Sequence, residues 1–550
     1  MNDKMGPLVS KTLVADWQAL ERTFLRPENE EAKNTLLKYM EQILFGLNDF
    51  LKAHVGITEE KSLKDLSEQF SETRLPKTPE KKLAEVITDL VQDIAPHAVN
   101  VASPYFVGHM TAAIPFFMVH LKSITAALNQ NVVKLETSKV VSILEKQILA
   151  KIHRLVFNRE EAFYAEHVQK TESALGCFTE DGTIANITAL WVARNRLFGP
   201  KPGFDGIEKQ GVAAAYSAYD LDRCVILVSR LGHYSLRKAG GILGIGNENV
   251  IAIDVDQNHH LDLQCLQKKI RQLKNEGKTR ILAIIGIAGA TETGTIDPLE
   301  ALSEISRTYG VHFHIDAAWG GPTLMSDKYR HLLKGIELGD SVTIDGHKQF
   351  YMPMSCGMVY FKDPQALDAI AYHARYINRP GSVDLGIKSL SGSREANSLI
   401  LDSALKIMGT NGYALLIDHG IRTAREFADE IERRADFELT TPPTLNILTY
   451  RLYPAKLKQA FADQNKAGKK RIYDILNNIN RDVQRHQREA GKSFVSRTSL
   501  KGVEPWADER VVLRVVIMNP MTDIRILREI LDEQERIYRR TESGYPDMDA

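Results

Sequence analysis

The pattern of apolar and polar positions predicts strands that alternate with helices through the middle of the chain. Short apolar runs typical of buried strands lie at 224–229, 250–255, 281–287, 311–315, 341–344 and 358–361. Helical spacing separates several of these runs, as at 261–275 and 297–309. Strands that alternate with helices indicate a doubly wound α/β fold with a mostly parallel sheet.

The first part of the chain has helical rather than strand periodicity. Residues 30–51 place apolar side chains at helical spacing and predict an amphipathic helix that needs a partner surface. Residues 80–94 predict a second helix, and 59–76 reads as a polar connector. Long helical periodicity covers 121–157. Between them, 103–117 is an aromatic, proline-containing loop that we expect to be a packed connection or a wall of an active site.

The last part of the chain changes character near residue 400. Helices are expected at 404–433 and 523–538, and strands at 446–452 and 511–517. This mixture predicts a second, smaller α+β domain. The expected organisation is an N-terminal helical segment (1–100), a large domain (101–400) and a C-terminal small domain (401–550).

Composition narrows the classes of function. Lysine plus arginine and aspartate plus glutamate number 70 each, so no basic excess favours nucleic acid or an anionic membrane. The longest apolar run, 281–290, is too short to span a bilayer, and residues 1–8 show no apolar segment of a signal peptide. The four cysteines contain no C-x-x-C pair, which argues against a cysteine zinc site and predicts a cytoplasmic protein.

An acid and a lysine follow two of the predicted strands. Asp316 ends the run V-H-F-H-I-D, and Lys348 ends D-G-H-K. Ligand chemistry in open α/β sheets gathers at the carboxyl ends of strands. The lysine could form a Schiff base with an aldehyde cofactor, and the acid could keep a pyridine nitrogen protonated. A zinc site made by His312, His314 and Asp316 on one strand face is the alternative.

Three further strand ends carry polar residues that could join this site. His233 follows the strand at 224–229, and Thr291 follows the strand at 281–287. The stretch T-E-D-G-T before the helical run at 184–190 offers a phosphate turn at Gly182, because helix N-termini bind anions. Asp181 could equally be a plain N-cap. Several groups converging on one sheet edge indicate a catalytic site more strongly than any one motif.

These motifs resemble the group II pyridoxal-phosphate-dependent amino acid decarboxylases, which include glutamate, aromatic amino acid and histidine decarboxylases. H-I-D-A-A-W-G-G, D-G-H-K, H-Y-S-L-R-K-A-G and A-G-A-T-E-T-G-T-I-D-P each resemble a family motif. The resemblance is strong over about 100–400 and looser beyond. It is closest to a bacterial branch that acts on aspartate or glutamate. It implies the fold of aspartate-aminotransferase-type (fold type I) enzymes and a homodimer with the active site at the interface.

The resemblance assigns roles around the ring of pyridoxal 5'-phosphate. Lys348 would bind the aldehyde covalently, and Asp316 would pair with the pyridinium nitrogen. His233 would stack on one ring face, with Ala318 against the other. Thr291 would lie near the ring hydroxyl.

The phosphate end carries two departures from the family pattern. Gly182 and Thr183 would meet the phosphate, assisted by His347. The acidic pair Glu180–Asp181 stands where the family has small or neutral residues, and an acid beside a phosphate is repulsive unless it points away. Asp345 replaces the asparagine that usually precedes the His-Lys pair.

The implied reaction removes the α-carboxylate of an acidic amino acid. Tyr376, on a loop, or His233 would return the proton to the α-carbon. The side-chain carboxylate of the substrate requires a cation or several donors, and His109 and Arg394 are the candidates. No metal is expected.

The substrate stays open at this point. Aspartate, which would give β-alanine, is preferred. Glutamate, which would give γ-aminobutyrate, differs by one methylene, worth roughly 1–3 kcal/mol in a fitted pocket. Cysteine sulfinate is a third acidic substrate. A catalytically silent protein that binds the cofactor and serves as an interaction module is the alternative from another class.

Overall fold

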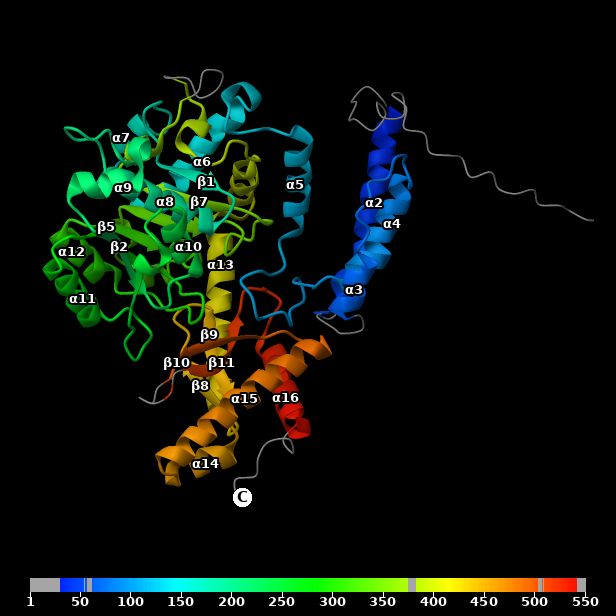
Figure 1. Ribbon diagram of the computed structural model, residues 1–550. Helices are drawn as coiled ribbons and strands as arrows, with labels where there is room; N and C mark the ends of the chain where they lie inside the picture. The colour runs from blue at the N-terminus through cyan, green and yellow to red at the C-terminus, as the bar shows by residue number, and fades with distance from the viewer. Residues whose placement is uncertain are drawn as a thin grey trace, which may run out of the picture.

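The computed structural model describes residues 30–53, 55–56, 62–373, 382–502, 507 and 509–541, with side chains from residue 37 onward. A seven-stranded sheet forms its centre (Figure 1), in the order β1-β7-β6-β5-β4-β2-β3. The strands are β1 (Gly176–Thr179), β2 (Arg223–Ser229), β3 (Val250–Ile253), β4 (Thr279–Ile287), β5 (His312–Asp316), β6 (Ser341–Asp345) and β7 (Gly357–Phe361).

The sheet is mostly parallel, as the sequence predicted. Strands β2 to β6 pair in parallel, and β7 alone runs against both of its neighbours, β6 and β1. β7 follows β6 after only a short connection, which permits an antiparallel return, whereas a parallel pair needs a crossover. Strand β1 lacks a long apolar run and is absent from the sequence prediction.

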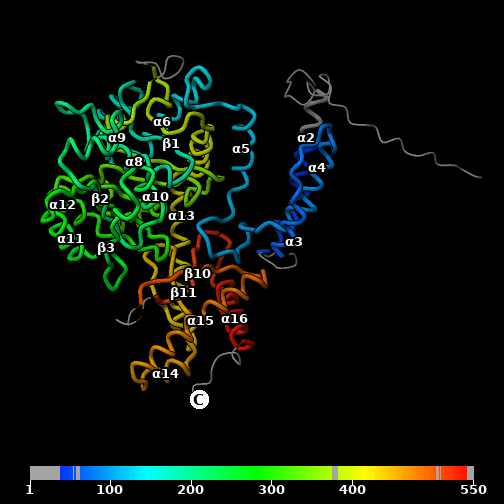
Figure 2. The backbone as a smooth tube through the Cα atoms, in the orientation of Figure 1, coloured from blue at the N-terminus to red at the C-terminus, as the bar shows by residue number. Residues whose placement is uncertain are grey.

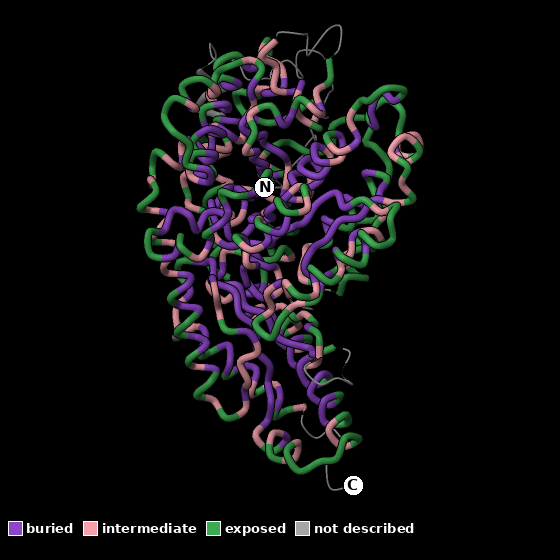
Figure 3. Tube along the Cα trace, turned by 90° about the vertical axis from the view of Figure 1, so that its left-hand side faces the viewer, coloured by how far each residue is buried: buried purple, intermediate pink, exposed green. Residues whose placement is uncertain are grey.

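Alternation along the strands separates two apolar layers. In β2, Val225 and Leu227 belong to one buried cluster, and Ile226 and Val228 belong to another. Helices α8 (Gly182–Leu197), α9 (Ile207–Tyr219) and α10 (Tyr234–Ile242) cover the second face. Helices α6 (Val140–Phe157), α11 (Leu263–Asn275) and α12 (Leu299–Tyr309) cover the first. Buried backbone therefore runs through the middle of the molecule (Figure 3).

The C-terminal region forms a second sheet with its own core. Its four antiparallel strands follow the order β10-β11-β9-β8, and lie below the large sheet in the view of Figure 2. Their bounds are β8 (Phe437–Thr441), β9 (Ile447–Leu452), β10 (Ser496–Lys501) and β11 (Glu509–Val516). Helices α14 (Ala455–Asp463), α15 (Lys466–Ala490) and α16 (Ile524–Thr541) accompany them. The small α+β unit is present, with β8 and β10 added to the predicted strands.

Helix α13 (Asn397–Arg433) joins the two cores. Its residues up to Ile421 pack in the core of the large domain, and those from Ala424 pack in that of the small domain. The helix is kinked at Gly409, whose φ of 61° departs from helical geometry. The expected domain boundary at 400 thus falls just inside this continuous element.

The N-terminal helices stand beside the body as an arm (Figure 1). This arm comprises α2 (Glu30–Lys52), α3 (Leu63–Gln69) and α4 (Leu83–Asp89). Helix α2 packs on α4 and on the turns that follow it. The helix α3 lies inside the stretch expected to be a connector, because a Ser62–Asp65 capping box starts a helix there.

The periodicity over 121–157 does not form one long helix. Helix α5 (Phe116–Leu128) ends at Asn129, which adopts the left-handed conformation (φ 46°), and α6 starts only at Val140. Asparagine tolerates this conformation better than most residues, so it can stop a helix despite continuing apolar spacing. In the described part of the chain, no helix is long and apolar enough to cross a membrane.

Candidate active site

A cavity of about 300 Å³ opens at the carboxyl ends of the parallel strands. It collects the residues that follow four strands: His233 after β2, Thr291 after β4, Asp316 at the end of β5, and Lys348 after β6. Parallel strands end at one edge of a sheet, which explains why residues far apart in sequence meet here. The predicted residues Gly182, Thr183, His233, Thr291, Asp316, Ala318, His347, Lys348 and His109 all line this cavity.

Asp316 is held in place by a buried amide. Its side chain is 7% exposed. Asn186 of α8 donates from Nδ2 to Oδ2 of Asp316 at 2.9 Å, and the amide of Ala318 donates to Oδ1 at 3.2 Å. The Oδ1 of Asn186 in turn faces His314 Nε2 at 3.0 Å. The carboxylate is therefore fixed in orientation at the floor of the cavity.

The same bonds weigh against the zinc alternative. Both ring nitrogens of His314 are engaged, one with Asn186 and the other with Ser341 at 2.8 Å. His312 also contacts Ser341. Among the described residues, no group of three metal-ligating side chains is arranged to hold an ion. The alternation that places these residues on one strand face serves a hydrogen-bond chain leading to Asp316.

His233 is linked to the same network. Its Nδ1 lies 2.9 Å from Ser235 Oγ, which accepts a hydrogen bond from Asn186 Nδ2 at 3.1 Å. Burial lowers the pKa of His233, Asp316 acts in the opposite direction, and Lys348 adds to the lowering. The imidazole is thus neutral near pH 7, which suits packing against an aromatic ring.

The predicted phosphate turn forms the N-terminus of α8. Asp181 is the N-cap and accepts from the amide of Ile184 at 2.9 Å. Ser391 donates to Glu180 at 2.7 Å. The acidic pair that departs from the family pattern is therefore engaged locally. Gly182 and Thr183 remain at the cavity, where the first amides of a helix have no intrahelical partner.

Lys348 forms an ion pair with Asp345. Its Nζ lies 2.9 Å from Oδ2 of Asp345, whose side chain is 3% exposed. His347 Nε2 lies 3.8 Å from the same oxygen, and its Nδ1 lies 2.7 Å from the carbonyl oxygen of Cys356. The other oxygen of Asp345, Oδ1, is buried and has no hydrogen-bond partner. Sequence reasoning noted Asp345 as a departure but gave it no role.

A histidine and an arginine from other parts of the chain also line the cavity. His109 comes from the loop before α5, and its Nδ1 lies 3.2 Å from Thr111 Oγ1. Arg514 comes from β11 of the small domain and donates from Nη2 to the carbonyl of Gly108 at 3.1 Å. Burial lowers the pKa of His109, and the charges of Arg514 and Lys348 lower it further. The loop before α5 and the small domain therefore both border the cavity that contains the predicted cofactor residues.

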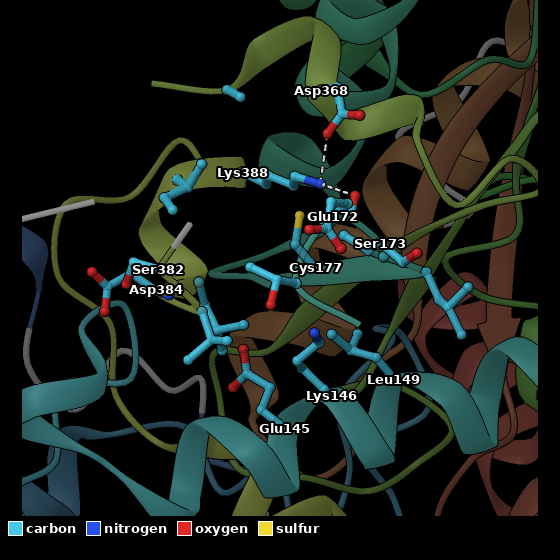
Figure 4. Close-up of a pocket in the computed structure, with 18 of the residues that line it drawn as sticks. Glu145, Lys146, Leu149, Glu172, Ser173, Cys177, Asp368, Ser382, Asp384 and Lys388 are labelled. Carbon is cyan, nitrogen blue, oxygen red and sulfur yellow. Dashed lines mark hydrogen bonds and ion pairs between the residues drawn. The ribbon is translucent and has the colours of Figure 1, made fainter. Parts of the chain in front are cut away.

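Arg394, the second predicted substrate ligand, does not reach this cavity. It lies buried against Glu145, with Nη1 donating to Oε2 at 3.0 Å and Nη2 to the other carboxylate oxygen. It lines a separate cavity of about 500 Å³ beside β1, where Cys177 and Lys388 also lie (Figure 4). Since a buried guanidinium with a bidentate partner is already neutralised, we correct the expected role of Arg394 to a structural ion pair.

Tyr376, one of the two predicted proton donors, lies outside the described residues. The positions of His233 and of the cavity around it are described, so His233 is the candidate donor whose surroundings are known.

Sequence reasoning missed Asn186 and Arg514, two polar residues that line the cavity. Asn186 is a buried amide within the apolar run T-I-A-N-I-T, and Arg514 is a lone charge inside the strand V-V-L-R-V-V. Buried polar residues in apolar surroundings need partners, so each carried a detectable signal. The strand partner of Arg514 and its approach to the large domain, however, depend on the tertiary structure.

The residues present fit pyridoxal phosphate. A side chain on Gly182 would place its Cβ 2.8 Å from the Asp345 carboxylate, so only glycine leaves the turn open. Next to this turn, a lysine, a fixed carboxylate and a neutral histidine surround one space. These are the groups that the aldehyde, ring nitrogen and ring face of the cofactor require.

Comparisons with known proteins agree with this chemistry. The family described as "Pyridoxal-dependent decarboxylase conserved domain" matches residues 65–453. Aspartate 1-decarboxylase from Aliivibrio fischeri is 45% identical over 98% of this chain and 97% of its own. L-2,4-diaminobutyrate decarboxylase from Acinetobacter baumannii is 26% identical over 81% of this chain and 83% of its own.

A solved structure supports the fold. The glutamate decarboxylase domain of a Vibrio parahaemolyticus protein, described as diaminobutyrate-pyruvate transaminase and L-2,4-diaminobutyrate decarboxylase, aligns with a TM-score of 0.78. It covers 96% of this chain and 100% of that structure at 20% identity. The fold of a pyridoxal-phosphate-dependent decarboxylase therefore spans nearly the whole chain.

Proposed function

We propose that this chain, which belongs to the pyridoxal-dependent decarboxylase family, is a carboxy-lyase that converts L-aspartate into β-alanine and carbon dioxide. The 45% identity to an aspartate 1-decarboxylase, over 98% of the chain, carries the choice of substrate. The position of Arg514 in the cavity supports an acidic substrate, because a buried guanidinium favours binding of a carboxylate.

Pyridoxal phosphate, when bound, supplies the electron sink for loss of the α-carboxylate. In our proposal the side chains of this protein hold and orient the cofactor. Lys348 is the covalent attachment point, Asp316 holds the proton on the pyridine nitrogen, and His233 packs on the ring. Ala318 and Thr291 complete the ring pocket. The network through Asn186 supports Asp316 and His233 together.

The phosphate and the substrate are assigned to opposite ends of the cavity. The amides of Gly182 and Thr183, at the start of α8, bind the phosphate, and His347 assists. Arg514 binds the side-chain carboxylate of aspartate, and His109 lies beside it as a neutral donor. Burial also lowers the pKa of Arg514, with Glu292 acting in the opposite direction, but an arginine remains charged at any working pH.

The α-carbon must receive a proton after carbon dioxide leaves. We propose His233 or Tyr376 as its source. Replacing His233 and Tyr376 one at a time distinguishes the two candidates. The variant that lacks the proton donor should still bind the cofactor but should no longer form product.

A homodimer is supported by exposed apolar residues along the arm and on helix α5. Phe45 of α2 is 72% exposed and Phe116 of α5 is 78% exposed. Other exposed apolar side chains follow the same region: Leu44, Leu51, Leu63, Leu75, Leu83, Val119 and Ile124. Exposed apolar side chains gathered in one region are typical of interaction surfaces. In this proposal the arm packs on a second copy of the chain. The protein is proposed to be cytoplasmic, where its four free cysteines stay reduced.

The direct test is carbon dioxide release by cofactor-loaded protein. Values of kcat/KM for aspartate, glutamate and cysteine sulfinate are compared under one condition. A preference for aspartate supports the proposal, and a preference for glutamate moves the assignment to γ-aminobutyrate formation. Absence of release from every amino acid tested, with the cofactor bound, would favour a catalytically silent protein.

A further inference from the structure

Asp345 occupies an unusual position between the attachment lysine and the phosphate turn. One of its oxygens, Oδ2, pairs with Lys348 Nζ at 2.9 Å. Both oxygens lie 2.8 Å from the point where a Cβ on Gly182 would stand. The carboxylate therefore borders the turn to which the cofactor's phosphate is assigned, while it neutralises the lysine.

The second oxygen has no partner. Oδ1 of Asp345 is buried and accepts no hydrogen bond in the described structure. A buried carboxylate oxygen without a donor is costly, and native structures rarely leave one. The phosphate assigned to this turn offers acceptors and no donor, so the orphaned oxygen can bond to it only if the carboxyl group itself carries a proton.

The titratable groups around Asp345 come from its own loop and from helices α8 and α10. Lys348 and His347 face it from its own loop, and the neutral thiol of Cys356 packs behind. From α8 comes the N-cap Asp181, and from α10 comes His233, whose lowered pKa keeps it uncharged. A phosphate dianion entering here meets Asp345 as a second anion, and two anions at hydrogen-bond distance repel strongly in a buried site.

We propose that Asp345 couples cofactor binding to proton uptake: it is the counter-ion of Lys348 in the free protein, and it accepts one proton when the phosphate enters the turn. The protonated carboxyl then donates its O–H to a phosphate oxygen. The step is a proton transfer from solvent to the carboxylate, and no other bond changes. Asp345 is thereby a positioning residue for the cofactor, and the inference rests on the cofactor site of the proposed function but not on the choice of aspartate.

The test uses pyridoxamine 5'-phosphate, which carries the phosphate but cannot react with Lys348. Pyridoxamine, which lacks the phosphate, is the matched ligand. Calorimetric titrations in buffers of different ionisation enthalpy count the protons taken up at pH 7.5. In the native protein we expect about one more proton for the phosphorylated ligand than for pyridoxamine. In Asp345→Asn the two ligands should take up equal numbers of protons.

Affinity provides an independent readout. Uptake of one proton predicts that the native protein binds pyridoxamine 5'-phosphate up to about tenfold more weakly for each unit of rising pH. Asp345→Asn, which keeps an N–H donor but cannot titrate, should bind with little pH dependence and at least as tightly as the native protein at pH 8.5. Asp345→Ala, which has no donor, should bind more weakly than Asp345→Asn. Thermal melting of each ligand-free variant checks that it folds.

Three outcomes would overturn the inference. Equal excess proton uptake in the native protein and in Asp345→Asn would locate the proton on the phosphate itself. A loss of more than tenfold in the affinity of Asp345→Asn at pH 8.5 would show that the negative charge is needed. Absence of binding by the native protein would remove the cofactor site and the proposed function together, whereas normal binding without aspartate turnover would remove only the substrate assignment.

Discussion

Replacing Arg514 by glutamine tests the substrate assignment most directly. The side chain is 9% exposed and lies at the cavity, so the carboxylate it binds is largely shielded from water. Truncating one partner of a buried, hydrogen-bonded charge pair costs roughly 2–5 kcal/mol. A loss of about 3 kcal/mol corresponds to a decrease of about 150-fold in kcat/KM for aspartate.

A matched control is available on the same strand. Arg510 lies four residues earlier in β11, is equally buried and pairs with Glu438 at 2.9 Å, but it does not line the cavity. Steady-state kinetics of Arg514→Gln and Arg510→Gln, both loaded with cofactor, are therefore compared. We expect a change of no more than a few fold for Arg510→Gln. Equal losses in the two variants would refute the reasoning, because they would reflect damage to the small domain.

Three other perturbations follow from the structure. Lys348→Ala should abolish turnover while the protein still binds the cofactor non-covalently; turnover within tenfold of native would reject Lys348 as the attachment point. Phe45→Glu should shift the protein towards monomer in light scattering, whereas Leu338→Glu, away from the arm, should not; an unchanged mass would argue against the arm as interface. Burial lowers the pKa of His153 to about 4, so the unfolded chain binds a proton below about pH 6.5 that the folded chain refuses. The free energy of unfolding therefore decreases by about 3 kcal/mol as pH falls from 6.5 to 4. In His153→Gln the denaturation midpoint should depend less on pH over that range.

The sequence predicted the mostly parallel sheet well because most of its strands are buried on both faces. Continuous apolar runs such as 281–287 leave little ambiguity once flanking helices are recognised. Short or half-exposed strands were missed, as with β8 and β10, because their periodicity is weak over so few residues. The break at Asn129 shows that one backbone conformation can override apolar spacing that continues past it.

The candidate site was predictable where residues follow strands and unpredictable where domains meet. Asp316, His233 and Lys348 each follow a strand of one parallel sheet, so their order in the chain already implies one shared edge. Arg394 was misassigned because a sequence does not show that Glu145, 249 residues away, already neutralises it. Arg514 was missed for the converse reason, since only the docking of the small domain brings it to the cavity.

By itself, the sequence determined the parallel sheet, the family motifs and the polar residues that stand at the strand ends, because these depend on local periodicity and on residues a few positions apart. The tertiary structure decided which charges are paired and which are available. It placed Asp345 against Gly182 and Lys348, and it set Arg514 over the cavity. Pairing depends on distances of a few ångströms between segments far apart in the chain, and no pattern along one segment records them.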